Sequence, residues 1–235
     1  MGNGFELRIG MTIQQVMSNI SNMNTTDKTK QLIINFCNND HDKKITDSVE
    51  LAMLDSWSKG SEKVKMLTAE GMTEVTNRNL QENVKEYRKG NNYLQITDDS
   101  DGVYLATYLA NGNVTNVLGD TNKDGFADYR LLNINKDINT NHERLTTYCD
   151  NNIDGVFENK NIDETIYNND TRIETQKSIN LFTNEKMTDF KTITKETYDK
   201  QGNHHGQIRT EVNNLTGATI KTYHNFVTGD ELFIE

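Results

Sequence analysis

Oxygen-bearing side chains occupy alternate positions in the segment "GDTNKDGFADYR", which runs from Gly119 to Arg130. A calcium ion takes roughly six to eight oxygen ligands, and a tight loop can supply them by presenting alternate side chains to the ion. Gly125 permits the sharp turn that such a loop requires. A plain hairpin would explain Asp124 and Gly125 but not the flanking oxygens. The spacing therefore predicts a calcium loop, loop 1 (residues 120–128), whose candidate ligands are Asp120, Asn122, Asp124, the backbone carbonyl of Phe126, and Asp128.

The same arrangement recurs further along the chain in "CDNNIDGVFEN". At the corresponding positions this segment, loop 2 (residues 150–158), offers Asp150, Asn152, Asp154, the backbone carbonyl of Val156, and Glu158. Chance matches arise in a chain rich in acidic and amide residues, so the recurrence supports the two loops together more than either one alone. By contrast, "TDDSDG" at 97–102 has Thr97 and Leu105 at the outer positions, which indicates a plain turn or a decayed site.

A third candidate lies between two expected helices, in "FCNNDHDKKITDSVEL". This segment, the helix loop (residues 38–50), resembles an EF-hand. It departs from the EF-hand pattern because Lys43 replaces the turn glycine and Glu50 stands one position beyond the usual glutamate. Asp47 and Glu50 also fit a helix-capping box, which would explain both residues without a metal. Both interpretations stay open, and the ligands that the resemblance implies are Asn38, Asp40, Asp42, the backbone carbonyl of Lys44, and Glu50.

The spacing of apolar residues changes along the chain, and with it the kind of secondary structure that is expected to hold these loops. Helical periodicity, with Thr12, Thr26 or Asp27, and Asp47 as N-caps, predicts helices within residues 12–20, 26–37, 47–60 and 80–90. From Asn91 onward the pattern alternates, and segments rich in Thr, Tyr, Ile and Val are separated by turn signals. These signals are Asp101-Gly102, Asn111-Gly112, Asp124-Gly125, Asp154-Gly155, Gly202-Asn203 and Thr216-Gly217.

We therefore predict an α+β protein with two domains. The first, at 1–90, is a helical EF-hand-like domain, and the second, at 91–235, is a repetitive antiparallel β-hairpin or meander domain. Several expected strands end in Thr-Tyr just before a turn, at 107, 147, 197 and 222. A repeat of this kind builds a sheet in which each hairpin mainly contacts its neighbours, and the helices would cap one end.

Loop 1 resembles the aspartate-rich loops of FG-GAP and VCBS-type repeats, and those of thrombospondin type 3 and related bacterial calcium repeats. In these families the pattern D-x-N-x-D-G-x-x-D binds calcium, and loop 2 follows it with Glu158 as the last residue. "YLANGNVTNV" and "YDKQGN" separately resemble tyrosine-aspartate (YD) repeats, which implies extended hairpins. The complete propellers and shells of these families are much longer than this chain, so the resemblance implies the loops and hairpins alone.

Composition opposes several classes of partner. A formal net charge of −10, without a dense run of Lys and Arg, opposes the phosphate neutralisation that nucleic-acid binding requires. No segment approaches the roughly 18 consecutive apolar residues of a membrane span, and "MGNGFELRIG" lacks the pattern of a signal peptide. Cys37 and Cys149 fall in different expected domains, which favours two unpaired buried thiols. His204-His205 lies in an expected turn, without the spacing of a zinc site.

These features favour a non-enzymatic function, since no nucleophile elbow, P-loop or dinucleotide-binding glycine motif is present. The first hypothesis is a calcium-binding structural or adhesive module of a bacterial surface or secreted protein. Ca²⁺ would make the hairpin loops rigid, and the sheet would contact another protein or a surface glycan. One alternative is a cytoplasmic EF-hand-like scaffold that responds to calcium. The other is a hydrolase domain with a catalytic metal, for which no base can be identified.

Overall fold

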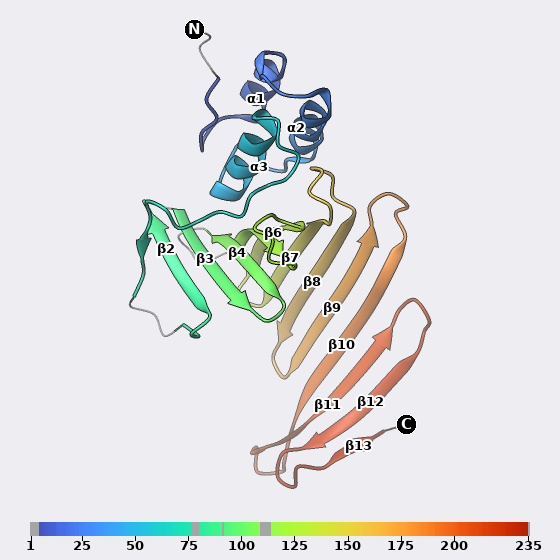
Figure 1. Cartoon of the computed structure of the whole chain (residues 1–235). Coiled ribbons are helices and arrows are strands. Elements are labelled where there is room, and N and C mark those ends of the chain that lie inside the picture. The colour runs from blue at the N-terminus through green and yellow to red at the C-terminus, as the bar shows by residue number, and fades with distance from the viewer. Residues whose placement is uncertain (1–4, 77–79, 91, 109–113, 235) are drawn as a thin grey trace. The chain divides into compact units, whose positions relative to one another are not determined.

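The computed structural model describes residues 5–76, 80–90, 92–108 and 114–234. Its architecture is α+β, as predicted, with short helices followed by strands that form an antiparallel meander in chain order (Figure 1). The helices are α1 (Ile13–Asn19), the 3-10 turn η1 (Ile20–Asn22), α2 (Asp27–Asn39) and α3 (Ser48–Ser58).

Each α-helix begins after a capping side chain that the sequence places there. Thr12 and Gln15 form a capping box at α1, and the Thr26 hydroxyl accepts a hydrogen bond from the Thr29 backbone at α2. At α3 the Asp47 carboxylate accepts from the backbone of Glu50 at 3.1 Å. The capping box expected there is only half formed, because the Glu50 carboxylate accepts from the Thr46 backbone at 2.8 Å.

The strands follow one another as neighbours in the sheet. Thr-Tyr pairs lie at or near the ends of β4, β7, β10 and β12, as the repeat predicted. The predicted turn signals fall at strand ends or between strands, apart from Asn111-Gly112, which lies outside the described residues. The bounds are β1 (Thr73–Glu74), β2 (Val84–Lys89), β3 (Asn92–Asp99), β4 (Gly102–Tyr108), β5 (Val114–Asp120), β6 (Tyr129–Asn139), β7 (His142–Asp150), β8 (Asn159–Asn168), β9 (Thr171–Asn180), β10 (Lys186–Tyr198), β11 (His204–Asn213), β12 (Thr219–Asn225) and β13 (Glu231–Phe233).

The helix expected at 80–90 is wrong, because this segment contains β2. β2 pairs antiparallel with β3, and Tyr87 stands opposite Leu94. The pattern of residues 84–89 suits a strand as well as a helix, and helix propensity is a weak preference that tertiary pairing overrides. The hydrogen-bonding partner on β3 therefore decides the conformation.

The chain divides into two compact units. Unit 1 comprises Met1–Asn133 and Cys149–Glu158, and unit 2 comprises Ile134–Tyr148 and Asn159–Glu235. Unit 1 holds the helices, strands β1–β5 and all three candidate loops. The boundary expected near residue 90 lies within unit 1, because the helices share a core with the strands that follow them.

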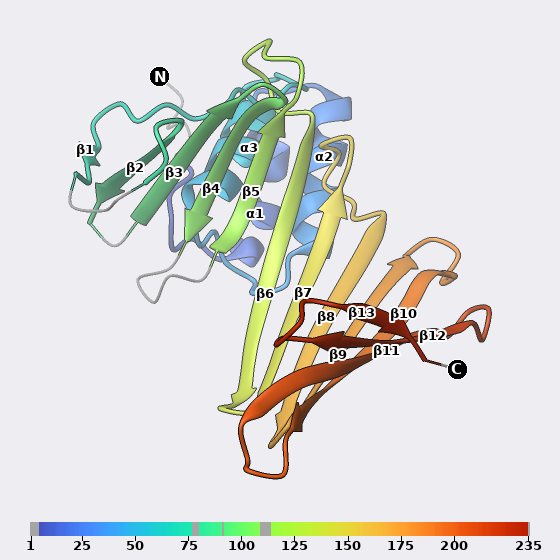
Figure 2. The ribbon, with the colours of Figure 1, turned by 90° about the horizontal axis from the view of Figure 1, so that it is seen from below.

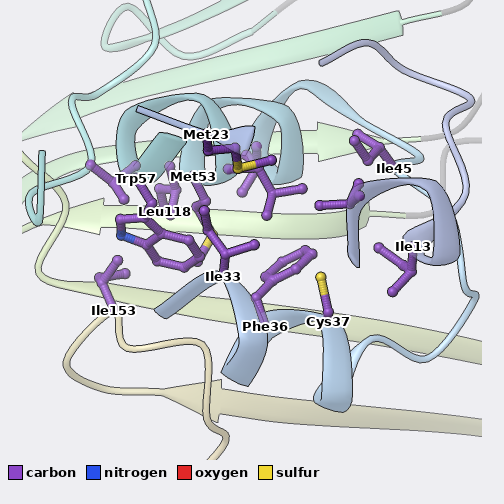
Figure 3. Packing of buried hydrophobic residues seen from close by; sticks show 14 of the residues in the cluster. Ile13, Met23, Ile33, Phe36, Cys37, Ile45, Met53, Trp57, Leu118 and Ile153 are labelled. Carbon is purple, nitrogen blue, oxygen red and sulfur yellow. The ribbon is translucent and has the colours of Figure 1, made fainter. Parts of the chain in front are cut away.

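The core of unit 1 lies between the helices and one face of β3–β5 (Figure 2). Phe36 of α2 and Trp57 of α3 meet edge to face, with ring centroids 6.1 Å apart. Leu94, Leu105 and Leu118 supply the sheet side of this core, part of which Figure 3 shows. Burying a large apolar side chain contributes about 1.5–3 kcal/mol, so this shared core holds the helices on the sheet.

The two cysteines are buried thiols that form no disulfide, as predicted. Burial, with a smaller contribution from Asp40, raises the pKa of the Cys37 thiol to about 12. Burial likewise raises the pKa of Cys149. Both thiols are therefore neutral packing groups near pH 7.

Unit 2 is a sheet without a comparable core. None of its described side chains is a buried hydrophobic. Its apolar residues instead form cross-strand rows, such as Ile166, Ile173 and Ile193 on β8, β9 and β10. Each cross-strand pair contributes about 0.2–1 kcal/mol, so unit 2 depends mainly on backbone pairing between neighbouring strands.

Candidate metal centres

Loop 1 connects β5 to β6 and is held by hydrogen bonds to its own acidic and amide side chains. The buried carboxylate of Asp120, the last residue of β5, accepts from the backbone of Asp124 at 3.2 Å and of Gly125 at 2.8 Å. The Asn122 side chain accepts from the Asp124 backbone at 2.8 Å, and Asp124 accepts from the Phe126 backbone at 2.9 Å. These bonds direct the side-chain oxygens toward the inside of the turn.

Asp128 closes loop 1, and the turn itself uses this residue. Its carboxylate accepts from the backbone of Thr121 at 2.8 Å and from the Thr121 hydroxyl at 2.6 Å. These two hydrogen bonds hold the pKa of Asp128 below its usual value. The inference that a turn alone gives no reason for Asp128 is therefore wrong, because Asp128 ties the two ends of loop 1 together.

Loop 2 connects β7 to β8 and repeats this geometry position by position. Asp150, the last residue of β7, accepts from the backbone of Asp154 at 3.1 Å and of Gly155 at 2.9 Å. Asn152 accepts from Asp154 at 3.1 Å, and Asp154 accepts from the Val156 backbone at 2.9 Å. The two segments that share a sequence pattern therefore share a conformation.

Glu158 takes the place of Asp128 at the end of loop 2. Its carboxylate accepts from the Asn151 backbone at 2.8 Å, and its own backbone donates to the Cys149 carbonyl at 2.9 Å. Asp128 makes the equivalent backbone bond to the Gly119 carbonyl at 2.7 Å. A longer acidic side chain thus reaches the same part of the loop.

Loop 2 brings three carboxylates together. One oxygen from each of Asp150, Asp154 and Glu158 lies within 4.8 Å of the others. Asp150 is fully buried, and burial raises its pKa to about 6. A buried carboxylate is costly in its charged form, and a bound cation would offset that cost. The described part of loop 1 forms no such group, and Asp124 lies 3.4 Å from the Lys63 ammonium instead.

Loop 2 also packs directly against α2. Ile153 has a positive φ of 57° and a side chain that enters the hydrophobic core near Trp57 (Figure 3). The Asn35 side chain donates to the Asp154 carbonyl at 3.2 Å. A Cβ added at Gly155 would lie 2.6 Å from the backbone nitrogen of Phe36. The loop therefore fits against the helix only because residue 155 lacks a side chain.

Loop 1 contacts the segment that follows α3. Its Gly125 carbonyl accepts from the Met66 backbone at 3.0 Å, and the Ala127 backbone donates to the Val64 carbonyl at 2.8 Å. The Lys63 ammonium lies 4.8 Å from the centre of the Phe126 ring. Both hairpin loops thus join the sheet to the helical part of unit 1.

The helix loop forms a second acid group. One oxygen from each of Asp40, Asp42 and Glu50 lies within 4.8 Å of the others. Lys43 adopts a positive φ of 64°, so the turn forms although the EF-hand glycine is missing. Burial raises the pKa of Asp40 to about 6 and that of Glu50 to about 7. The resemblance implied two further ligands. Asn38 is exposed in the last turn of α2. Lys44, whose carbonyl was the other, is also exposed and forms a β-bridge with Thr12, the N-cap of α1.

Buried negative charge exceeds buried positive charge in unit 1. Arg130 is the one buried basic side chain among the residues that the structure describes. Sequence reasoning missed it, because an arginine near a strand end is normally exposed. The one available signal is the alternation of β6, which puts Arg130 on the same face as Leu132. The buried acidic side chains of this unit are Asp40, Asp47, Glu50, Glu86, Asp120 and Asp150.

Both acid groups offer oxygen ligands, which suit a hard cation such as Ca²⁺. The histidines considered from the sequence have other partners. His204 Nε2 bonds the Glu196 carboxylate, and His205 Nδ1 bonds the Tyr223 hydroxyl. Within the described residues, neither histidine belongs to a group that could hold a metal.

Comparison with known proteins gives no assignment. No family model, curated protein or solved structure matches this chain significantly. None of the described helices has the length and apolar character needed to cross a bilayer. Function must therefore be inferred from the loops and from the surfaces that they hold.

Proposed function

We propose that this chain is a calcium-binding, non-enzymatic structural module in which ions at the hairpin loops fasten the helices to the sheet. The observation that carries the proposal is the convergence of Asp150, Asp154 and Glu158 around a fully buried carboxylate. These side chains would hold Ca²⁺, which would supply the positive charge that the buried group lacks. Because the same loop packs on α2, a more rigid loop 2 also means a more firmly held helix.

Loop 1 is proposed as a second and weaker calcium site. It presents equivalent donors at Asp120, Asn122, Asp124, the Phe126 carbonyl and Asp128, with the same internal hydrogen bonds as loop 2. Lys63 already neutralises part of its charge, which reduces the electrostatic gain from an ion.

The sheet of unit 2 is proposed as the surface that contacts a protein or a glycan. One face carries a polar hollow of about 430 Å³, lined by residues that include Arg172, Glu174, Glu196 and Arg209. We place the module at a cell surface or outside the cell. Extracellular calcium modules bind with dissociation constants of about 10⁻⁴ to 10⁻³ M, and a cytoplasmic scaffold would need much tighter sites.

Thermal unfolding in calcium and in chelator tests this proposal. We expect Ca²⁺ to raise the unfolding midpoint of the wild type by several degrees, since about 1 kcal/mol shifts the midpoint of a domain of this size by roughly 2–4 °C. Asp154→Asn, which keeps an oxygen acceptor for the Val156 backbone, should remove most of this rise. The midpoint should be monitored by circular dichroism and by fluorescence of Trp57.

Asp199→Asn is the matched control. Asp199 lies in the turn between β10 and β11 and accepts from the backbones of Gln201 and Asn203, both at 2.8 Å, outside the two acid groups. This variant should respond to calcium like the wild type. Equal midpoints in calcium and chelator, or equal losses in both variants, would show that loop 2 is not a calcium site.

A further inference from the structure

Arg130 occupies a central position among the three candidate loops. It follows loop 1 by two residues at the start of β6, and its side chain is only 3% exposed. Its Nη2 donates to Glu50 Oε1 at 3.1 Å, and its Nε donates to Asn116 Oδ1 at 2.7 Å. The guanidinium is therefore bound to one member of the acid group in the helix loop.

Asn116 extends this network to the start of α3. Its side-chain nitrogen donates to Asp47 at 2.7 Å, and Asp47 caps α3 through the backbones of Val49 and Glu50. Arg130, Asn116, Asp47 and Glu50 thus form a buried chain of hydrogen bonds that joins the sheet to the helix loop. Such a network holds each charge in a fixed position.

The guanidinium also contacts loop 2. It lies 4.9 Å from the ring centre of Phe36 in α2 and 5.5 Å from that of Phe157, between the ligand candidates Val156 and Glu158. Phe157 also contacts His41 of the helix loop, with ring centroids 5.8 Å apart. Moving the Arg130 side chain would therefore change contacts in loop 2 as well as in the helix loop.

The acid group contains a buried carboxylate oxygen without a hydrogen-bond partner. Asp40 is 8% exposed, and its buried Oδ2 has no hydrogen-bond partner among the residues that the structure describes. Buried carboxylate oxygens are normally paired, so an unpaired one beside Asp42 and Glu50 indicates a position where a cation can bind. Arg130 donates a hydrogen bond to Glu50 but none to the unpaired oxygen of Asp40, so a cation could bind beside Asp40.

We propose that Arg130 acts as an internal cation that shares the acid group of the helix loop with calcium and thereby weakens calcium binding there. A calcium ion at Asp40, Asp42 and Glu50 must share Glu50 with the guanidinium and lie close to its charge. Like charges repel strongly in a buried site. The choice of calcium rests on the function proposed above, but this acid group is separate from loops 1 and 2.

Isothermal titration of the full chain with CaCl₂ tests this inference. Asp124→Asn and Asp154→Asn together provide a background in which the helix loop is the remaining acid group. Adding Arg130→Gln removes the charge but keeps hydrogen-bonding capacity toward Glu50 and Asn116. We expect this change to tighten calcium binding by about tenfold or more, since a unit charge within several ångströms contributes at least about 1.4 kcal/mol at an effective dielectric of about 20.

Two further variants separate charge from shape. Arg130→Lys keeps the charge and should leave the affinity close to that of the background. Arg88→Gln removes an exposed arginine of β2 whose Nε donates to the Gly90 carbonyl, and it should also have no effect. An Arg130→Gln affinity that is unchanged or weaker, or one matched by Arg88→Gln, would overturn the inference.

The folding of the variant provides a second readout. If calcium can replace the guanidinium, Arg130→Gln should be unstable in chelator and should regain its fold in millimolar calcium. A variant that is unfolded in both conditions would contradict the inference. The Asp154→Asn variant tests calcium binding at loop 2, which is the proposed function. The Arg130 variants test the internal cation. Each proposal can therefore fail without the other.

Discussion

At the scale of single residues, unit 1 buries six carboxylates but only one basic side chain among its described residues. Asp150 shows this most clearly, because it is fully buried and still carries two backbone hydrogen bonds that favour its charged form. Burial outweighs those bonds and raises its pKa to about 6. Either a proton or a cation can therefore stabilise the folded state at this position.

Acidification should stabilise the calcium-free protein between about pH 7 and pH 5. The folded pKa of Asp150 is about 6, compared with 3.8 for the unfolded chain. Its contribution is complete below the unfolded value and is lost as the pH rises through about 6. The full shift corresponds to about 3 kcal/mol, of which about 1 kcal/mol is lost between pH 5 and pH 7. Asp40 and Glu50 act in the same direction. Urea unfolding at each pH in chelator would measure this change.

Asp150→Asn should reduce the slope of that pH profile, because only Asp40 and Glu50 then contribute to it. Asp199→Asn should not, because hydrogen bonds from Asn203 lower the pKa of Asp199, and its charge does not change in this window. Protons and calcium compete for the same oxygens, so stabilisation by calcium should also be weaker at pH 5 than at pH 7.5. If the profiles of the wild type and Asp150→Asn are parallel, burial of Asp150 does not control this pH response.

At the scale of elements, the hairpin loops join secondary structures that are distant in the sequence. Loop 2 packs on α2, and loop 1 hydrogen-bonds to residues 64–66 after α3. Both contacts involve backbone groups of the loops, but only loop 2 lies so close to its neighbour that a Cβ added at its turn glycine would clash. The two turn glycines have the same left-handed conformation but different surroundings, and this difference can be measured.

Gly155→Ala should destabilise the protein more than Gly125→Ala. Gly155 has a φ of 80°, and its added Cβ would lie 2.6 Å from the Phe36 nitrogen and 3.0 Å from the Leu32 carbonyl. Gly125 has a φ of 87°, and its added Cβ would meet open space. Both changes place an L-residue in the left-handed region, which costs about 1–2 kcal/mol, and Gly155→Ala adds overpacking of about 1–3 kcal/mol.

Denaturant unfolding followed by the fluorescence of Trp57, the one tryptophan of the chain, would report on this part of unit 1. The two variants differ only in the environment of the new methyl group, so each serves as the control for the other. Equal free energies of unfolding would mean that loop 2 does not rest on α2 in solution.

At the scale of the whole molecule, the two units differ in how they are stabilised. Unit 1 has a buried core, whereas unit 2 has cross-strand rows and backbone pairing without a buried hydrophobic side chain among its described residues. Regions with few buried contacts open more easily than regions around a core. Calcium at loops 1 and 2 would add stability to unit 1 only.

Hydrogen exchange measured by mass spectrometry should therefore distinguish the units. Amides of β9–β12 should exchange faster than those of β3–β5, and calcium should slow exchange in unit 1 while leaving β9–β12 unchanged. Chelator provides the reference state. Uniform protection across both units, or a calcium effect centred on β10 and β11, would contradict this division of stability.

Local signals in the sequence determined much of this protein. The alternating segments and glycine turns predicted the meander, the capping residues predicted three helix starts, and the repeated acidic spacing predicted two loops that share their internal hydrogen bonds. These features depend on neighbours within a few residues, which the sequence displays directly.

Tertiary structure decided the rest. β2 is a strand because β3 pairs with it. Asp150 and Asp154 converge with Glu158, whereas the carboxylates of loop 1 do not converge. Arg130 is buried because α2, α3 and loop 2 surround it, and contacts between such distant segments leave no local pattern in the chain.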